Sequence, residues 1–79
     1  MKKIGKENAL EVIESSKGKI ITVVFNASKG ERKLNGQYLK TTKLGLVKMK
    51  EFKGEKGIRN FYIKDLISFK ADKVEYKIS

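Results

Sequence analysis

The chain has 79 residues, with 19 lysines and arginines against nine acidic residues, and a formal net charge of +10. It contains no cysteine, histidine, proline or tryptophan. These absences exclude a disulfide framework and the usual zinc sites, and they remove the commonest general base of catalysis at neutral pH. The length fits one domain with a small core, because a chain of this size buries only about 60% of its unfolded surface.

The first predicted element is a helix over residues 6–17. Asn8 followed three residues later by Glu11 is typical of a capping box, with Asn8 as the N-cap. Lys17 and Gly18 are typical of a helix end. Apolar residues between them recur at helical spacing, namely Ala9, Leu10, Val12 and Ile13. A helix this short is not stable alone, so we expect it to dock on the rest of the domain.

From residue 19 onward the apolar pattern changes to the period of two that is typical of β-strands. Residues 20–25 are apolar on both faces, which predicts a central strand with Ile21, Val23 and Phe25 inward. Gly36, in the middle of the next strand, predicts a bulge or a sharp bend. Further strands are predicted over residues 31–39, 44–52, 58–63, 67–70 and 74–78, with a single tight turn at 64–66.

Five or six short strands at this spacing favour a closed or partly closed small barrel. We therefore expect a mainly β (α+β) fold with a single domain over residues 1–79. The barrel, strongly bent and antiparallel, spans residues 19–78, and the N-terminal helix caps one open end.

Half of the net positive charge lies in one quarter of the chain. Residues 40–59 hold seven basic and two acidic residues, a net charge of +5. Such clustering favours contact with a polyanion, because cationic groups release counterions from nucleic acid. Seventeen of the 19 basic residues are lysines, which a genome poor in G and C would also favour. The predicted phosphate-binding residues are Lys40, Lys43, Lys48, Lys50, Lys53, Lys56 and Arg59.

Three aromatic residues stand beside lysines on the predicted strands, as in small barrels that stack bases while lysines contact phosphates. They are Tyr38, Phe52 and Tyr62, and for both tyrosines the rim of the core is an equal alternative. The other three phenylalanines, at positions 25, 61 and 69, are predicted to be core.

The sequence offers no catalytic constellation. None of the acidic residues forms an evident pair, no serine has a histidine to activate it, and the seven glycines form no phosphate-binding loop. We expect a non-enzymatic protein that needs no cofactor or metal. No apolar run reaches the roughly 20 residues of a membrane span, and the start of the chain does not read as a signal peptide. The predicted location is the cytoplasm, without membrane contact.

Four segments carry a resemblance to a known group of proteins. Residues 23–34, 44–47, 57–69 and 74–78 resemble small bacteriophage and mobile-element proteins with Src-homology-3-like barrels. The C-terminal part is similar to the Sm-like barrel of WYL-type regulatory domains. The resemblance implies that Arg32 and Arg59 occupy recurring positions, where they either bind a ligand or pair with an acidic neighbour such as Asp65. It also implies a role in the host cell's cytoplasm.

Two functions are therefore expected from the sequence. The first is nucleic-acid binding with little sequence specificity, and Arg32 is included in that candidate surface. The alternative is a phage-type inhibitor or adaptor that docks on an acidic host protein, with Ile20, Val24 and Leu39 as an apolar face. Homo-oligomerisation through a barrel edge is compatible with either function.

Overall fold

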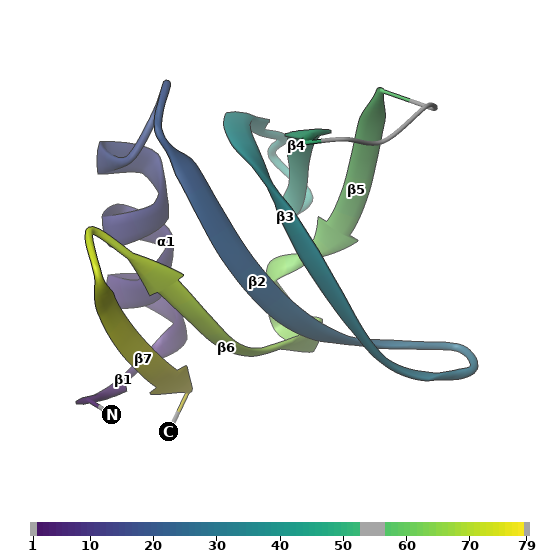
Figure 1. Cartoon of the computed structure of the whole chain (residues 1–79). Helices are drawn as coiled ribbons and strands as arrows, with labels where there is room; N and C mark the ends of the chain where they lie inside the picture. Colours follow the sequence, from purple (N-terminus) through teal and green to yellow (C-terminus); the bar gives the residue numbers. More distant parts are fainter. Residues whose placement is uncertain (1, 53–56, 79) are drawn as a thin grey trace.

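The computed structural model describes residues 2–52 and 57–78. These residues form a helix on one side of a strongly bent sheet (Figure 1). The elements are α1 (Lys6–Ser15), the 3-10 helix η1 (Ile63–Asp65), and strands β1 (Lys2–Ile4), β2 (Ile20–Ala27), β3 (Gly30–Thr41), β4 (Leu46–Glu51), β5 (Ile58–Tyr62), β6 (Leu66–Ala71) and β7 (Val74–Ile78). The prediction of a mainly β fold with an N-terminal helix is confirmed.

The described strands form a single seven-stranded sheet in the order β1-β7-β6-β2-β3-β4-β5. The prediction of five or six strands in a closed barrel is wrong, since pairing stops at β5 on one side and at β1 on the other. The extra strand, β1, pairs in parallel with β7. Side chains rather than a backbone ladder connect β2 with β5, because Phe25 stacks on Phe61 with ring centroids 5.0 Å apart. The sheet therefore curls without closing.

Helix α1 begins at Lys6, as the predicted range 6–17 has it, and ends two residues earlier, at Ser15, while its N-cap lies three residues before the predicted one. Gly5 is the N-cap, and its carbonyl accepts the first helical bond from the Ala9 N–H at 2.8 Å. Asn8 lies inside the first turn, so its expected role as the N-cap is not realised. Ala9 and Ile13 are fully buried against the sheet, which confirms that the helix docks through its apolar face. Figure 1 shows the helix beside β6 and β7.

Two features shape strand β3, a close approach at Gly36 and a bulge at Leu39. A Cβ added to Gly36 would overlap the carbonyl oxygen of Lys50 and would lie 3.2 Å from the Glu51 Cα, so only glycine lets β4 approach this closely. The bulge expected at Gly36 occurs instead at Leu39, where the pairing with β4 shifts between Tyr38 and Lys40. The pairing at Gly36 itself is regular, so the predicted bulge lies three residues further along β3, and a sharp bend at Gly36 stays a prediction.

The two faces of the sheet differ sharply in polarity. The inner face, defined by Ile21, Val23 and Leu34, is covered by α1 and holds the core. The outer face carries the residues between them, including Thr22 and Val24, and is mostly polar. Strict alternation along β2 and β3 produces this division, as it does in half-buried strands. The inner face also includes Tyr38, Val47, Met49, Phe61, Leu66, Phe69 and Ala71.

The closing hairpin matches its prediction. Strands β6 and β7 pair antiparallel, and the turn between them places Asp72 and Lys73 at φ angles of 50° and 66°. Two positive φ values in succession are typical of a type I′ turn, whose twist suits a two-residue hairpin. The single tight turn predicted at residues 64–66 is present as η1, one residue earlier.

Candidate nucleic-acid interface

Three lysines stand together on the outer face of β3 and β4, and we call them the lysine ladder. Lys40 is directly opposite Lys48 in the antiparallel register, and Lys50 follows two residues later on β4. Lys48 and Lys50 lie on the side away from the core, because they alternate along β4 with the completely buried Val47 and Met49, and Lys40 shares their side as the partner of Lys48. The ladder is thus built by β4 alternation and by the bulge that brings Lys40 opposite Lys48.

The ladder has no compensating charge. No carboxylate lies within 4.0 Å of Lys40, Lys48 or Lys50 in the described part of the chain. The outer-face partners of these lysines are Gln37 on β3 and Asn60 on β5, both neutral. Like charges directly opposite each other on a sheet are destabilising. The fold therefore accommodates two like charges, Lys40 and Lys48, directly opposite each other, and a bound anion would neutralise them.

Exposed apolar and aromatic groups border the ladder on β5. Ile58 pairs with Lys50 and is 59% exposed, while Tyr62 pairs with Leu46 and is 42% exposed. The Lys64 Nζ lies 5.4 Å from the centre of the Tyr62 ring, so this ring carries a cation on one side. Tyr62 is accordingly at the surface rather than in the core, and it stands next to cationic groups.

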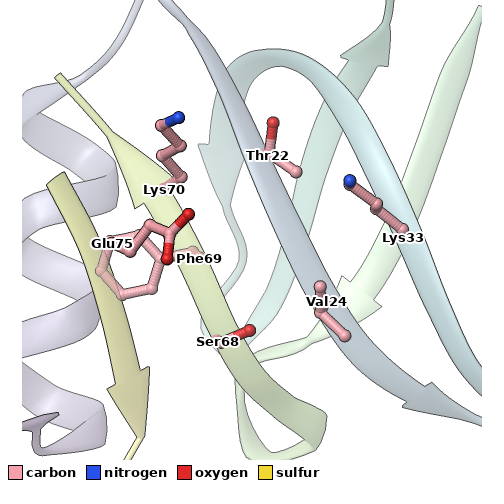
Figure 2. A pocket seen from close by; sticks show the side chains of 7 residues that line it. All are labelled: Thr22, Val24, Lys33, Ser68, Phe69, Lys70 and Glu75. Carbon is pink, nitrogen blue, oxygen red and sulfur yellow. The ribbon is translucent and has the colours of Figure 1, made fainter. Parts of the chain in front are cut away.

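A shallow hollow continues the outer face over β2, β3 and β6, with a volume of about 290 Å³. Figure 2 shows Lys33 and Lys70 on either side of Thr22, with Val24 on β2, Ser68 and Phe69 on β6, and Glu75 on β7 beside them. Thr22 pairs with Lys70, and Val24 pairs with both Lys33 and Ser68, so these residues share one face. The two ammonium groups and the Ser68 hydroxyl are suitable donors for phosphate oxygens. The Thr22 hydroxyl donates to the Asn35 Oδ1, and the Glu75 carboxylate, opposite Lys70 on β7, also lines the hollow.

Sequence reasoning did not find this hollow. The alternation of Ser68 and Lys70 with buried neighbours on β6 was visible in the sequence. Lys33, however, reaches the hollow only because β2 lies between β3 and β6. That neighbour relation depends on long-range pairing, which the sequence pattern does not specify.

Several predicted site residues lie elsewhere. Tyr38 is 6% exposed and belongs to the core, where its hydroxyl is 2.8 Å from the Thr41 Oγ1. It lies on the inner side of β3, so it is not part of a stacking surface. Lys43 is exposed in the turn between β3 and β4. Lys53 and Lys56 lie outside the described residues.

Phe52 lies just beyond the end of β4. Its side chain is 54% exposed, and its backbone N–H donates to the carbonyl of Asn35 at 2.8 Å. This bond extends the contact between β3 and β4 by one residue. Phe52 is therefore an exposed aromatic at the end of the strand that carries Lys48 and Lys50.

Both arginines lie on the other side of the sheet from the ladder. Arg59 is next to the buried Phe61 in the alternation of β5, and its Nε donates to the Glu51 Oε2 at 2.9 Å. Arg32 pairs with Phe25 across β2 and β3. The predicted basic patch is thus divided by the sheet, and the acidic partner of Arg59 is Glu51, not Asp65.

The described residues contain no group of three or more acidic, cysteine or histidine side chains that could hold a metal ion. Within the same residues, no helix has the length and apolar character needed to cross a membrane. Comparisons with protein-family models, curated proteins and solved structures gave no significant match to this chain.

Proposed function

We propose that the outer face of the sheet binds nucleic acid through its phosphate backbone, with little dependence on base sequence. The observation that carries this proposal is the lysine ladder, in which Lys40 directly faces Lys48 without a carboxylate nearby in the described residues. A phosphate bridging the two ammonium groups would replace their repulsion by two attractions.

The chemistry of the face supports contact with phosphates rather than with base edges. Its cations are lysines, which act as point charges and lack the planar fork with which arginine reads guanine. From the ladder, the outer face continues through Gln37 and Asn35 to the hollow flanked by Lys33 and Lys70. A strand that follows this path would meet lysines at both ends, with one carboxylate, Glu75, beside Lys70, and polar groups between the two ends.

Tyr62 is the aromatic residue that we place at this interface. It is 42% exposed and pairs with Leu46, two residues before Lys48 on β4. Stacking of an unpaired base on such a ring is worth about 1–3 kcal/mol and tolerates any base. We therefore expect single strands to bind more tightly than duplexes of the same charge.

The test is fluorescence anisotropy with labelled oligonucleotides of mixed sequence. Replacing Lys48 and Lys50 by glutamine should weaken binding strongly, because two phosphate contacts disappear. The matched control replaces Lys29 and Lys73 by glutamine, which removes the same charge from exposed turns between β2 and β3 and between β6 and β7. Equal losses in both variants would show a general charge effect and would contradict a site on the ladder.

Docking on an acidic protein is the second candidate function, and the edge strand β5 favours it. In the described residues β5 pairs only with β4, and it presents Ile58 and Tyr62 on its outer side. An exposed edge of this kind can add a strand from a partner. Of the apolar face proposed for this role, Ile20 is 50% exposed, while Val24 and Leu39 are half-buried. Recovery of one protein from nuclease-treated lysate, lost on charge reversal of Lys48, would favour this function.

The kinship with small phage proteins and action in a host cytoplasm remain proposals, supported by the bent antiparallel arrangement of β2 to β6. A non-enzymatic role is likewise a proposal.

A further inference from the structure

The only two arginines of this lysine-rich chain line a single cleft. The cleft lies where the sheet fails to close, between the β2–β3 hairpin and β5, and has a volume of about 460 Å³. This value lies in the range of about 300–1,000 Å³ that is typical of small-molecule sites. Codon preference for lysine does not explain two arginines, 27 positions apart, at one place. We call this feature the arginine cleft.

The floor of the arginine cleft is apolar and aromatic. Phe25 and Leu34 line it, and the Phe25 ring is stacked on Phe61 at an interplanar angle of 14°. Because Phe61 is 3% exposed, this stack holds Phe25 in a fixed orientation. A rigid ring at the base of a cleft is a suitable surface for a flat ligand group.

The rim is cationic, and one of its arginines is oriented by a carboxylate. The Arg59 Nε is bound to the Glu51 Oε2 at 2.9 Å, which leaves its two terminal Nη groups for a ligand. Arg32 has no carboxylate within 4.0 Å in the described residues, and Lys33 stands beside it. Three cations and one carboxylate leave the cleft with two net positive charges.

We propose that the arginine cleft binds a nucleoside monophosphate group, with its phosphate between the two guanidiniums and its base against Phe25. A phosphate monoester carries about −1.5 to −2 charges at pH 7, which matches the cleft better than a single carboxylate does. Arginine presents a planar fork that fits phosphate oxygens in a bidentate arrangement. The same chemistry occurs in a free nucleotide and at the phosphorylated end of a strand.

The two arginines lie on the opposite face of the sheet from the lysine ladder, so the cleft shares no residue with the ladder. Lys33 lines both the cleft and the hollow on the outer face. The test is titration of the protein with adenosine 5′-monophosphate, adenosine and inorganic phosphate, followed by NMR chemical shifts of backbone amides. The monophosphate should bind more tightly than the other two, with the largest shifts at Phe25, Arg32 and Arg59. The Arg32→Lys variant keeps the charge but loses the fork, so its affinity for the monophosphate should fall about tenfold or more.

Two further variants make the outcome decisive. Phe25→Leu, checked for folding by urea denaturation, should weaken binding of the monophosphate and leave binding of inorganic phosphate unchanged. Lys48→Gln should leave binding of the monophosphate unchanged, although it weakens binding of oligonucleotides. Oligonucleotides with and without a 5′-phosphate, added to the variant with Lys48 and Lys50 replaced by glutamine, then show whether strand ends also enter the cleft. No monophosphate binding at millimolar concentration, equal binding of inorganic phosphate, or an unchanged Arg32→Lys affinity would overturn the proposal.

Discussion

Replacing Lys48 with glutamate should stabilise the fold while it weakens nucleic-acid binding. In the native sheet Lys48 faces Lys40, and the substitution would put a carboxylate in its place. A cross-strand charge pair contributes roughly 0.2–1 kcal/mol, so losing a repulsion and gaining an attraction amounts to about 0.4–2 kcal/mol. Lys48 is half-buried and Lys40 is exposed, so solvent screening favours the lower half of this range.

The assay is urea denaturation of both proteins at low salt. For a domain of this size, a gain of 1 kcal/mol raises Tm by about 4–8 °C, which thermal denaturation also resolves. The gain should shrink in 1 M salt, where the Debye length is about 3 Å. Adding an oligonucleotide should stabilise the native protein more than Lys48→Glu, since only a bound ligand contributes to stability by mass action.

Lys29→Glu is the matched control, because it changes the net charge equally in the exposed turn between β2 and β3. If Lys29→Glu stabilises the protein as much as Lys48→Glu does, the effect is one of net charge, and the reasoning from the Lys40–Lys48 pair is refuted. A loss of stability in Lys48→Glu at low salt would refute it as well.

Three other substitutions test the description of the fold. Gly36→Ala should lower the free energy of unfolding in urea by at least about 1–3 kcal/mol, because its Cβ would overlap a backbone carbonyl of β4. The control Gln37→Ala, on the exposed side, should change it by no more than about 0.5 kcal/mol. Equal effects of the two substitutions would contradict the close approach of β4 to Gly36. Tyr38→Phe should lower the free energy of unfolding by about 1 kcal/mol, because it loses the contact with the Thr41 hydroxyl, and it should leave oligonucleotide affinity unchanged. A fall in affinity would show that Tyr38 belongs to the interface. Lys73→Gly should raise Tm, because Lys73 has a φ of 66° that costs a non-glycine residue about 1–2 kcal/mol; an unchanged or lower Tm would contradict that strain.

Alternation along the strands predicted several of the side chains that enter the core, although it left the place of Tyr38 open. Ile21, Val23 and Phe61 are buried as expected, and Arg59 shares the face of Phe61. This success is physical, since a shift of one residue would expose an entire strand face and cost the burial of every side chain on it. The sequence pattern is therefore strongest where one face must be apolar.

Closure and strand number were not predictable on the same basis. Strand β1 is only three residues long, and its partner around Tyr76 is more than 70 positions away, so no local periodicity reveals it. At the open side of the sheet, β5 meets β2 through the Phe25–Phe61 ring contact rather than through backbone pairing. Such contacts depend on tertiary structure, and propensity does not encode them.

The sequence predicted which residue type makes up the candidate site, but not how those residues are arranged. The excess of lysine in residues 40–59 was evident, but the opposition of Lys40 and Lys48 depends on the bulge at Leu39. The separation of Arg59 from Lys48 and Lys50 follows from strand alternation once the register is known. Charge counts along a chain thus indicate that a surface exists, while pairing decides which charges share it.

The most direct test of the account is the salt dependence of oligonucleotide binding by the native protein and by the variant with Lys48 and Lys50 replaced by glutamine. If the three ladder lysines each neutralise one phosphate, affinity for a single strand should fall about 20-fold between 50 and 200 mM salt through these contacts alone. The variant should show a slope smaller by about 1.4 in a plot of log K against log salt concentration. Equal slopes for the two proteins, or binding by the native protein that does not change with salt, would contradict a phosphate-binding lysine ladder.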